Sequence, residues 1–381
     1  MTEPAPDRAT PAHAPAATPA PAAGNAGSAR LGELLAERRI LICAGSGGVG
    51  KTTTAAALAL HAAMRGSRAC VVTIDPARRL ADALGLAELT NDPHLVDGDW
   101  PGELWALMLD TKTTFDQVVA ANAPTPEQAE AIYTNRFYRN ISAALSGTQE
   151  YMAMEKLHEL HSEGRFDLIV VDTPPTRRAL DFLDAPRRLT RLLDNRIFRL
   201  LMRPTRAGLR AVNVATQVFL RTVSKVVGGE VVGDAVRFFE AFEGMEQGFR
   251  DRAQVVLGLL SQPLTGWILV TTPRRDAIDE ALFFARRLHE SSIGIDSLVV
   301  NRIHPRFGPI PTTTAGAPPA LAALVANLVE LDNVASREEG YVDALAVRVP
   351  EAPVVRVPHL DSDVHDLEGL RAIGAHMLGA P

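Results

Sequence analysis

The residues with the clearest chemistry lie in one glycine-rich stretch, Gly45-Ser46-Gly47-Gly48-Val49-Gly50-Lys51-Thr52-Thr53, which fits the pattern G-x-x-x-x-G-K-[ST] of a phosphate-binding loop. Glycines let the backbone curl so that successive N–H groups face phosphate oxygens, and a following helix N-terminus adds its dipole. Lys51 is expected to reach the β- and γ-phosphates of a nucleotide, and the Thr52 hydroxyl to bind Mg²⁺. The alternative is a glycine-rich turn that carries a solvated lysine.

The flanks of this stretch decide between the two interpretations. Residues 39–44 are an apolar run expected to form a buried strand, and residues 54–64 are rich in good helix formers. Strand, glycine loop and helix in this order are the context that the motif requires. The sequence therefore predicts nucleotide binding.

Two aspartates end apolar runs elsewhere in the chain. Residues 69–75 form an expected strand that ends in Asp75, and residues 166–172 form another that ends in Asp172. The carboxyl ends of parallel strands are where open α/β sheets bind ligands. Asp75 is placed to orient or deprotonate an attacking water, or else to cap the next short helix. Asp172 is expected to hold Mg²⁺, directly or through a water.

An asparagine ends a third strand of this kind, at residues 295–301. The Asn301 amide can both donate to and accept from an adenine edge, or it is an ordinary turn residue. Strand patterns alternate with helix patterns throughout the chain, which is typical of a parallel sheet covered on both faces. The predicted fold is α/β, with a doubly wound, mostly parallel sheet around a phosphate-binding loop.

Two regions depart from this alternation. Residues 1–30 are rich in Ala and Pro and are expected to be a disordered tail, before one domain at 31–381. Residues 111–163 and 186–262 are expected to form a helical insertion at the nucleotide edge of the sheet. The second of these blocks carries amphipathic patterns with many basic residues. They either pack as ordinary helices with a solvated face or present an apolar surface to a client, a second subunit or a membrane surface.

Composition narrows the class of protein. The chain has 381 residues, 46% of them hydrophobic, and a net charge of −6, which argues against nucleic acid as the main partner. Its cysteines, Cys43 and Cys70, fall in expected core strands, so no disulfide framework or Cys-x-x-Cys metal pair is available. A reducing, cytoplasmic compartment fits. No apolar stretch reaches the ~18–20 residues of a membrane span.

Together, these residues resemble the ArsA-like ATPases, which include the arsenite-pump ATPase and the ATPase that targets tail-anchored membrane proteins. The resemblance covers residues 36–378 and rests on the loop, the turn that begins at Asp75, the segment Asp172-Thr173-Pro174-Pro175-Thr176 and the strand that ends in Asn301. It implies a dimer, homo- or heteromeric, with ATP and Mg²⁺ between the subunits. Asp75 then matches the water-activating carboxylate, Asp172 the start of the second switch, and Asn301 the adenine-reading residue.

One departure from the family pattern concerns the loop itself. The family carries a lysine immediately before the Gly-Gly pair, where it acts on the partner's phosphates, and this chain has Ser46 there. A serine brings no charge to a developing transition state. A substitute is expected in the pair Arg78 and Arg79 or in the pair Arg177 and Arg178, unless a partner subunit supplies the lysine.

Other departures concern the cargo. The thiolates that hold metalloid in the arsenite pump and the Cys-x-x-Cys pair that holds a dimer-bridging zinc in the tail-anchor factor are both missing. The leading hypothesis is a dimerising, Mg²⁺-dependent ATPase that couples nucleotide state to a hydrophobic client, partner or membrane component, and that is peripheral to the membrane if it reaches one. The alternative is a nucleotide-dependent chaperone or binding module with little hydrolysis. A MinD- or ParA-like partitioning ATPase fits the large helical insertion less well.

Overall fold

The structure is a computed structural model that describes residues 26–75, 78–136, 138–139, 148–174, 240–311 and 318–379, together with 185, 191, 233–234 and 237–238. Eight strands form one sheet in the order β3-β4-β2-β5-β1-β6-β7-β8. Every neighbouring pair is parallel except β3 and β4. The strands are β1 (Ile40–Ala44), β2 (Arg68–Thr73), β3 (His94–Val96), β4 (Glu103–Met108), β5 (Leu168–Asp172), β6 (Thr265–Thr271), β7 (Ser297–Ile303) and β8 (Val354–Pro358).

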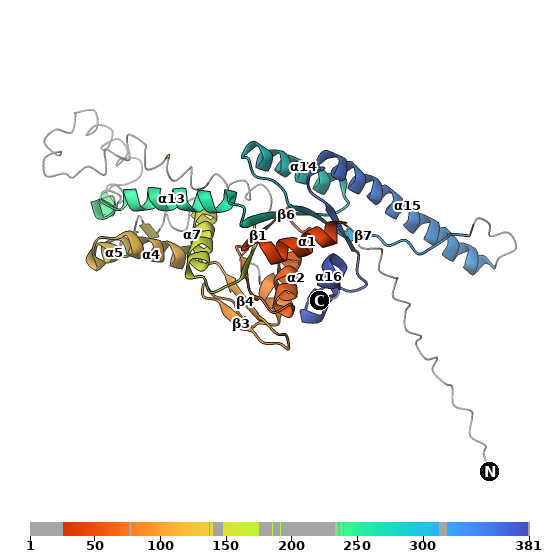
Figure 1. The fold of residues 1–381 in the computed structure, drawn as a ribbon, viewed down its shortest axis with the longest axis horizontal. Coiled ribbons are helices and arrows are strands. Elements are labelled where there is room, and N and C mark those ends of the chain that lie inside the picture. The colour runs from red at the N-terminus through yellow and green to blue at the C-terminus, as the bar shows by residue number, and fades with distance from the viewer. Residues whose placement is uncertain are drawn as a thin grey trace, which may run out of the picture.

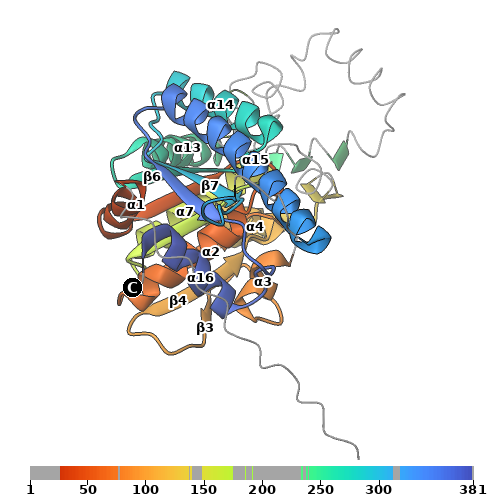
Figure 2. The ribbon, with the colours of Figure 1, turned by 90° about the vertical axis from the view of Figure 1, so that its right-hand side faces the viewer.

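Helices cover both faces of this sheet, so the predicted doubly wound architecture is confirmed (Figure 1). One face is covered by α1 (Ala26–Glu37), α2 (Lys51–Met64), α3 (Arg79–Leu84) and α16 (Leu367–Leu378). The other is covered by α7 (Thr148–Glu163), α13 (Glu246–Ser261), α14 (Arg275–Glu290) and α15 (Pro319–Arg348). Beyond the sheet, α4 (Thr111–Asn122) packs on α7, and α5 (Pro126–Tyr133) packs on α4 (Figure 1). Figure 2 shows α2 and α16 on one side of the sheet and α14 and α15 on the other.

Strand β1 shows why the chain folds this way. All five of its residues are buried. Side chains alternate along a strand, so Ile40, Ile42 and Ala44 join the core under α7, α13 and α14, whereas Leu41 and Cys43 join the core under α2 and α16. A strand that is apolar at every position fits only the middle of a sheet covered on both faces.

Several expected elements need correction. Helix α1 begins at Ala26, inside the stretch assigned to the tail, because Leu31 and Leu34 anchor it in the core and the helix extends one turn before them. Strand β3 and the 30-residue helix α15 were not foreseen. Tyr151, Met152, Met154 and Leu157 of α7 are buried in the core.

The basic amphipathic segment predicted within residues 186–262 falls largely outside the described residues, as does most of the expected tail. Helix α13, which lies in the described part of that block, packs its apolar side into the core with Phe249, Val256 and Leu260. In the described part of the chain, no helix combines the length and the apolar character needed to cross a membrane.

Candidate functional site

The glycine loop leaves the carboxyl end of β1 and leads directly into α2, as the sequence predicts. Strand β1 lies between β5 and β6, where the winding of the sheet changes direction and open α/β sheets bind their ligands. Gly50 stands at the N-cap of α2 with φ 96° and ψ 26°, a left-handed conformation. A Cβ atom at Gly50 would lie 2.3 Å from the Asn301 Nδ2, so both the backbone and the neighbouring strand require glycine.

Lys51 starts α2 and folds back over the loop. Its Nζ donates to the Ser46 carbonyl oxygen at 2.9 Å, and only 7% of the residue is exposed. Burial lowers the pKa of Lys51, against the nearby charges of Asp172 and Asp75, which raise it. The Lys51 ammonium is therefore held within hydrogen-bonding distance of the loop backbone.

Asp172 ends β5 and lies beside Thr52. The sheet register pairs Asp172 with Thr73 on β2 and with Cys43 on β1, which places it at the carboxyl edge next to the loop. Its Oδ2 accepts from the Thr52 hydroxyl at 2.7 Å and from the Thr73 hydroxyl at 3.0 Å. Its Oδ1 is buried and has no hydrogen-bond partner.

Burial raises the pKa of Asp172 to about 6, in spite of the hydrogen bonds from Thr52 and Thr73 and the charge of Lys51. A buried carboxylate oxygen without a partner is costly unless a ligand satisfies it. Carboxylate and hydroxyl oxygens are the ligands that Mg²⁺ takes in nucleotide sites. Thr52 and Asp172 together therefore have the donor set for that ion.

Asp75 follows β2 by two residues and is half-buried. Its backbone N–H donates to the Thr73 hydroxyl at 3.2 Å. The charge of Asp75 raises the pKa of both Lys51 and Asp172. The structure thus brings the second predicted carboxylate to the same edge of the sheet, beside the ammonium and the candidate Mg²⁺ ligand.

Asn301 lies inside β7, two residues before its end, rather than at the strand terminus that the sequence predicts. Its Nδ2 donates to the Val49 carbonyl oxygen at 3.0 Å, and the residue is buried. This amide therefore joins β7 to the loop. A recess of about 280 Å³ lies next to it, and its lining includes Thr53, Asn301, Pro358, His359 and Leu360. No local pattern in the sequence indicates the part of this recess that follows β8.

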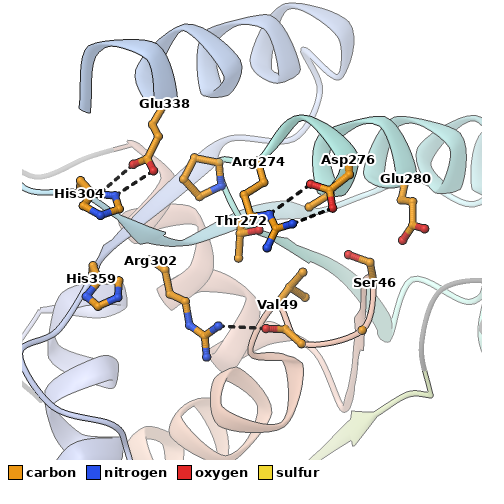
Figure 3. Close-up of a pocket in the computed structure, with 14 residues that line it drawn as sticks. Ser46, Val49, Thr272, Arg274, Asp276, Glu280, Arg302, His304, Glu338 and His359 are labelled. Carbon is orange, nitrogen blue, oxygen red and sulfur yellow. Dashed lines mark hydrogen bonds and ion pairs between the residues drawn. The ribbon is translucent and has the colours of Figure 1, made fainter. Parts of the chain in front are cut away.

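A larger cavity, of about 540 Å³, opens beside Ser46 and the loop glycines (Figure 3). Arg274 and Arg302 line it together with Ser46. Arg302 donates from Nη1 to the Gly48 carbonyl oxygen at 3.2 Å and has a left-handed φ of 62°. Arg274 forms a two-pronged ion pair with Asp276. Sequence reasoning missed both arginines, because only the order of β1, β6 and β7 in the sheet brings them to the loop.

The structure describes two of the four arginines that are expected to substitute for the missing lysine. Arg79 lies close enough for its charge to lower the pKa of Lys51. Arg78 is exposed. Arg177 and Arg178 lie outside the described residues. Both cysteines are buried and unpaired, and burial raises their pKa, as expected of core residues rather than of thiolate ligands.

Comparisons with known proteins agree with this geometry. A family model described as anion-transporting ATPase matches residues 38–308. The ATPase ARSA2 of Chlamydomonas reinhardtii is 24% identical over 347 residues, which are 90% of this chain and 84% of that protein. The ATPase ASNA1 homolog of Dictyostelium discoideum is 28% identical over 261 residues, 68% of this chain and 70% of that protein. The ATPase GET3 of Phaeosphaeria nodorum is 24% identical over 271 residues, 70% of this chain and 76% of that protein.

The family match extends from two residues before β1 to the segment after β7, so it contains the loop, both aspartates and Asn301. It also contains the strands whose order places these residues at one edge of the sheet. This chain therefore belongs to the anion-transporting ATPase family and is an ATPase.

Proposed function

We propose that the chain binds Mg²⁺ and ATP at the loop and hydrolyses the nucleotide there. One observation carries the proposal: the buried Asp172 Oδ1 lacks a partner beside the Thr52 hydroxyl, at the N-terminus of α2. This arrangement supplies two oxygen ligands to the ion, which draws electron density from the phosphates when bound. The N-terminus of α2 and the loop amides supply the donors for the phosphate oxygens.

Each remaining side chain has a defined part in the proposed reaction. Lys51 exchanges the Ser46 carbonyl for the β- and γ-phosphate oxygens and neutralises their charge. Asp75 orients a water toward the γ-phosphorus and accepts its proton as the new P–O bond forms. The bond to the β-phosphate oxygen then breaks, and ADP and inorganic phosphate are released. The adenine occupies the recess beside Asn301, whose amide contacts the base edge.

We assign the charge that Ser46 cannot supply to Arg79. Its effect on the Lys51 pKa supports this choice over Arg78, and a positive charge near the transferring phosphoryl group stabilises its transition state. We further propose that the chain works in the cytoplasm as a dimer, of two copies or with a related ATPase, and couples its nucleotide state to a hydrophobic client or membrane-protein partner. The family resemblance of the loop and of the two aspartates supports this wider role.

Nucleotide binding can be measured directly by calorimetry with a nonhydrolysable ATP analogue. The wild type is expected to bind in Mg²⁺ and to lose at least tenfold in affinity in EDTA. Lys51→Ala is expected to abolish binding, because it removes a buried cation from the phosphate site. Lys112→Ala is the matched control, since Lys112 pairs with Asp116 on the surface of α4. Equal binding by wild type and Lys51→Ala would contradict the proposal.

A second candidate function follows from Ser46 itself. The chain is then a nucleotide-dependent binding module that hydrolyses slowly, because the loop lacks its family lysine. The two candidates differ in Ser46→Lys. A self-sufficient ATPase that uses Arg79 gains little from that substitution, whereas a hydrolysis-poor module gains turnover without tighter nucleotide binding.

A further inference from the structure

A stripe runs along α15 at heptad spacing, with positions alternately three and four residues apart, and all of its members are apolar except Glu338. In the C-terminal half of the helix the stripe is buried against the domain, through Ala335, Val342 and Leu345. In the N-terminal half the same register continues as Leu321, Leu324, Leu328 and Leu331. One continuous stripe therefore has a covered half and an uncovered half.

The uncovered half stands away from the sheet. Figure 1 shows α15 running from beside α14 outward past β7, and in Figure 2 its N-terminal end comes toward the viewer. Within residues 319–334, all of which are described, none is buried. Leu321 is 50% exposed, Leu324 65% and Leu331 40%. We call residues 319–334 the α15 arm.

The arm has the properties of half an interface. It is about 24 Å long at 1.5 Å per residue, and isolated helices of this length are marginal in water. Residues 319–329 contain no ionisable side chain, so the arm presents apolar surface on several sides. Surface of this kind on a folded protein marks a site of contact with a partner.

The charges beside the stripe distinguish the classes of partner. The ionisable residues of the arm are Glu330 and Asp332, and the first basic residue after Pro319 is Arg337. Membrane surfaces are anionic and select basic residues beside an apolar face. An acidic arm with leucines at heptad spacing instead fits another helix with the same spacing, because each leucine then inserts into a gap between side chains of the facing helix.

We propose that the α15 arm pairs antiparallel with the α15 arm of a second copy of this chain. An axis through Ala326 sets Leu321 against the partner's Leu331 and Leu324 against the partner's Leu328, so that all four leucines of each copy are covered at once. Such self-complementarity is what a two-fold interface requires. With no charge from 319 to 329, two copies meet without like-charge repulsion over most of the contact.

The size of the arm predicts how the pairing depends on nucleotide. A strip roughly 24 Å long and about 10 Å wide offers about 240 Å² of contact on each copy, well below the about 800 Å² per partner of a stable interface. The arm alone is therefore too small to hold a lasting dimer. The inference rests on the proposed nucleotide-dependent dimer, in which the faces around the loop supply the remaining contact area.

The base of the arm is connected to the loop through described contacts. Glu338 accepts from the His304 backbone N–H at 2.8 Å and pairs with its Nδ1 at 2.8 Å. Glu338 also lines the cavity beside the loop, and Arg302 in the same segment donates to the Gly48 carbonyl oxygen (Figure 3). Pairing of the arms thus orders the helix that walls one side of the candidate nucleotide site.

The first test compares the association of three full-length proteins by sedimentation velocity, with and without Mg²⁺ and the ATP analogue. They are the wild type, the double variant Leu324→Glu/Leu331→Glu, and Val347→Glu as matched control. Val347 is 79% exposed on the same helix but lies outside the stripe. The double variant is expected to raise the dimer dissociation constant at least tenfold, while Val347→Glu leaves it unchanged. Circular dichroism and the affinity of the monomer for the analogue check that the variants fold.

The outcomes separate the arm from the proposed function. Equal dimerisation by wild type and double variant leaves the nucleotide-dependent dimer standing and overturns the arm pairing. A wild type that stays monomeric with bound nucleotide overturns both. The pairing is also overturned, in favour of a membrane surface, if monomeric wild type floats with phosphatidylglycerol vesicles and the variant Leu324→Glu/Leu331→Glu does not.

The second test fixes the orientation of the two arms. The native cysteines are buried, so introduced surface cysteines are the reactive ones. Chains carrying Leu321→Cys and chains carrying Leu331→Cys are mixed and oxidised with nucleotide. Antiparallel pairing predicts a disulfide between the two kinds of chain and little within either kind alone. Crosslinking within each kind alone, or none in any mixture, overturns the proposed arrangement.

Discussion

Asp172→Asn is expected to make the ligand-free protein more stable while it destroys the nucleotide site. The pKa of Asp172 rises from 3.8 to about 6 because the carboxylate is buried. At about 1.4 kcal/mol per pKa unit, the charged form costs the folded protein up to about 3 kcal/mol near neutral pH. Asparagine keeps an oxygen for Thr52 and Thr73 but places an unpaired N–H₂ where Oδ1 lies, which offsets about 1–2 kcal/mol of the gain. The net expectation is a gain of about 1–2 kcal/mol.

The sign of the pH dependence follows from the direction of the shift. The folded protein holds the Asp172 proton to higher pH than the unfolded chain, so this group destabilises the fold progressively as pH rises from 3.8 to about 6. The cost of the Asp172 charge is therefore full at pH 7.5 and about half as large at pH 5, where it only matches the cost of the unpaired amide, so the advantage of Asp172→Asn falls to about zero at pH 5.

Urea unfolding in EDTA at both pH values measures this difference. Asp167→Asn is the control, because the hydrogen bond from Arg68 lowers the pKa of that half-exposed carboxylate, and its loss brings no gain. Adding Mg²⁺ and ATP is expected to reverse the order of wild type and Asp172→Asn, since ligand binding stabilises the wild type alone. If Asp172→Asn is the less stable protein in EDTA at pH 7.5, the account of the orphaned carboxylate is wrong.

Three further substitutions test other parts of the account. Arg79→Ala is expected to lower the turnover rate at least tenfold with little change in nucleotide affinity, whereas Arg78→Ala stays near wild type. Steady-state kinetics measure this difference. Equal turnover rates for the two variants would remove Arg79 from its assigned role. Glu155→Gln, which breaks the ion pair of a buried carboxylate with α13, is expected to cost about 2–4 kcal/mol in urea unfolding. Phe284→Ala empties a fully buried position on α14 and is expected to lower the free energy of unfolding by about 3–5 kcal/mol. Phe283 is half-exposed, so Phe283→Ala is expected to lower it by less than about 1 kcal/mol. Similar losses of stability in the two variants would contradict the packing described for α14.

The sequence predicted the loop and the two aspartates because each is specified locally. Strand, turn and helix signals surround Lys51, and the positions of Asp75 and Asp172 after apolar runs identify the carboxyl edge of a parallel sheet. The alternation of strands and helices was sufficient for the fold class. Strand ends were displaced by two residues at Asn301, because an apolar pattern does not show where pairing with β8 stops.

What the sequence did not predict depends on contacts between distant segments. Arg302 reaches the loop because β7 is two strands from β1, an order that no local pattern contains. The unpartnered Asp172 Oδ1 follows from the way β2, β5 and α2 pack around it. The heptad spacing in α15 was present in the sequence from Leu321 onward, but only the structure separates its buried half from its exposed half.

Phosphate release from ATP, measured across a range of protein concentrations, tests the central claim most directly. Wild type and Lys51→Ala are compared in Mg²⁺, with Lys112→Ala as the matched control. The account predicts a wild-type specific activity that rises with protein concentration and a loss of at least about 100-fold in Lys51→Ala, because a buried cation at the reacting phosphates is removed. Undiminished turnover in Lys51→Ala would contradict the assignment of the loop as the site of ATP hydrolysis.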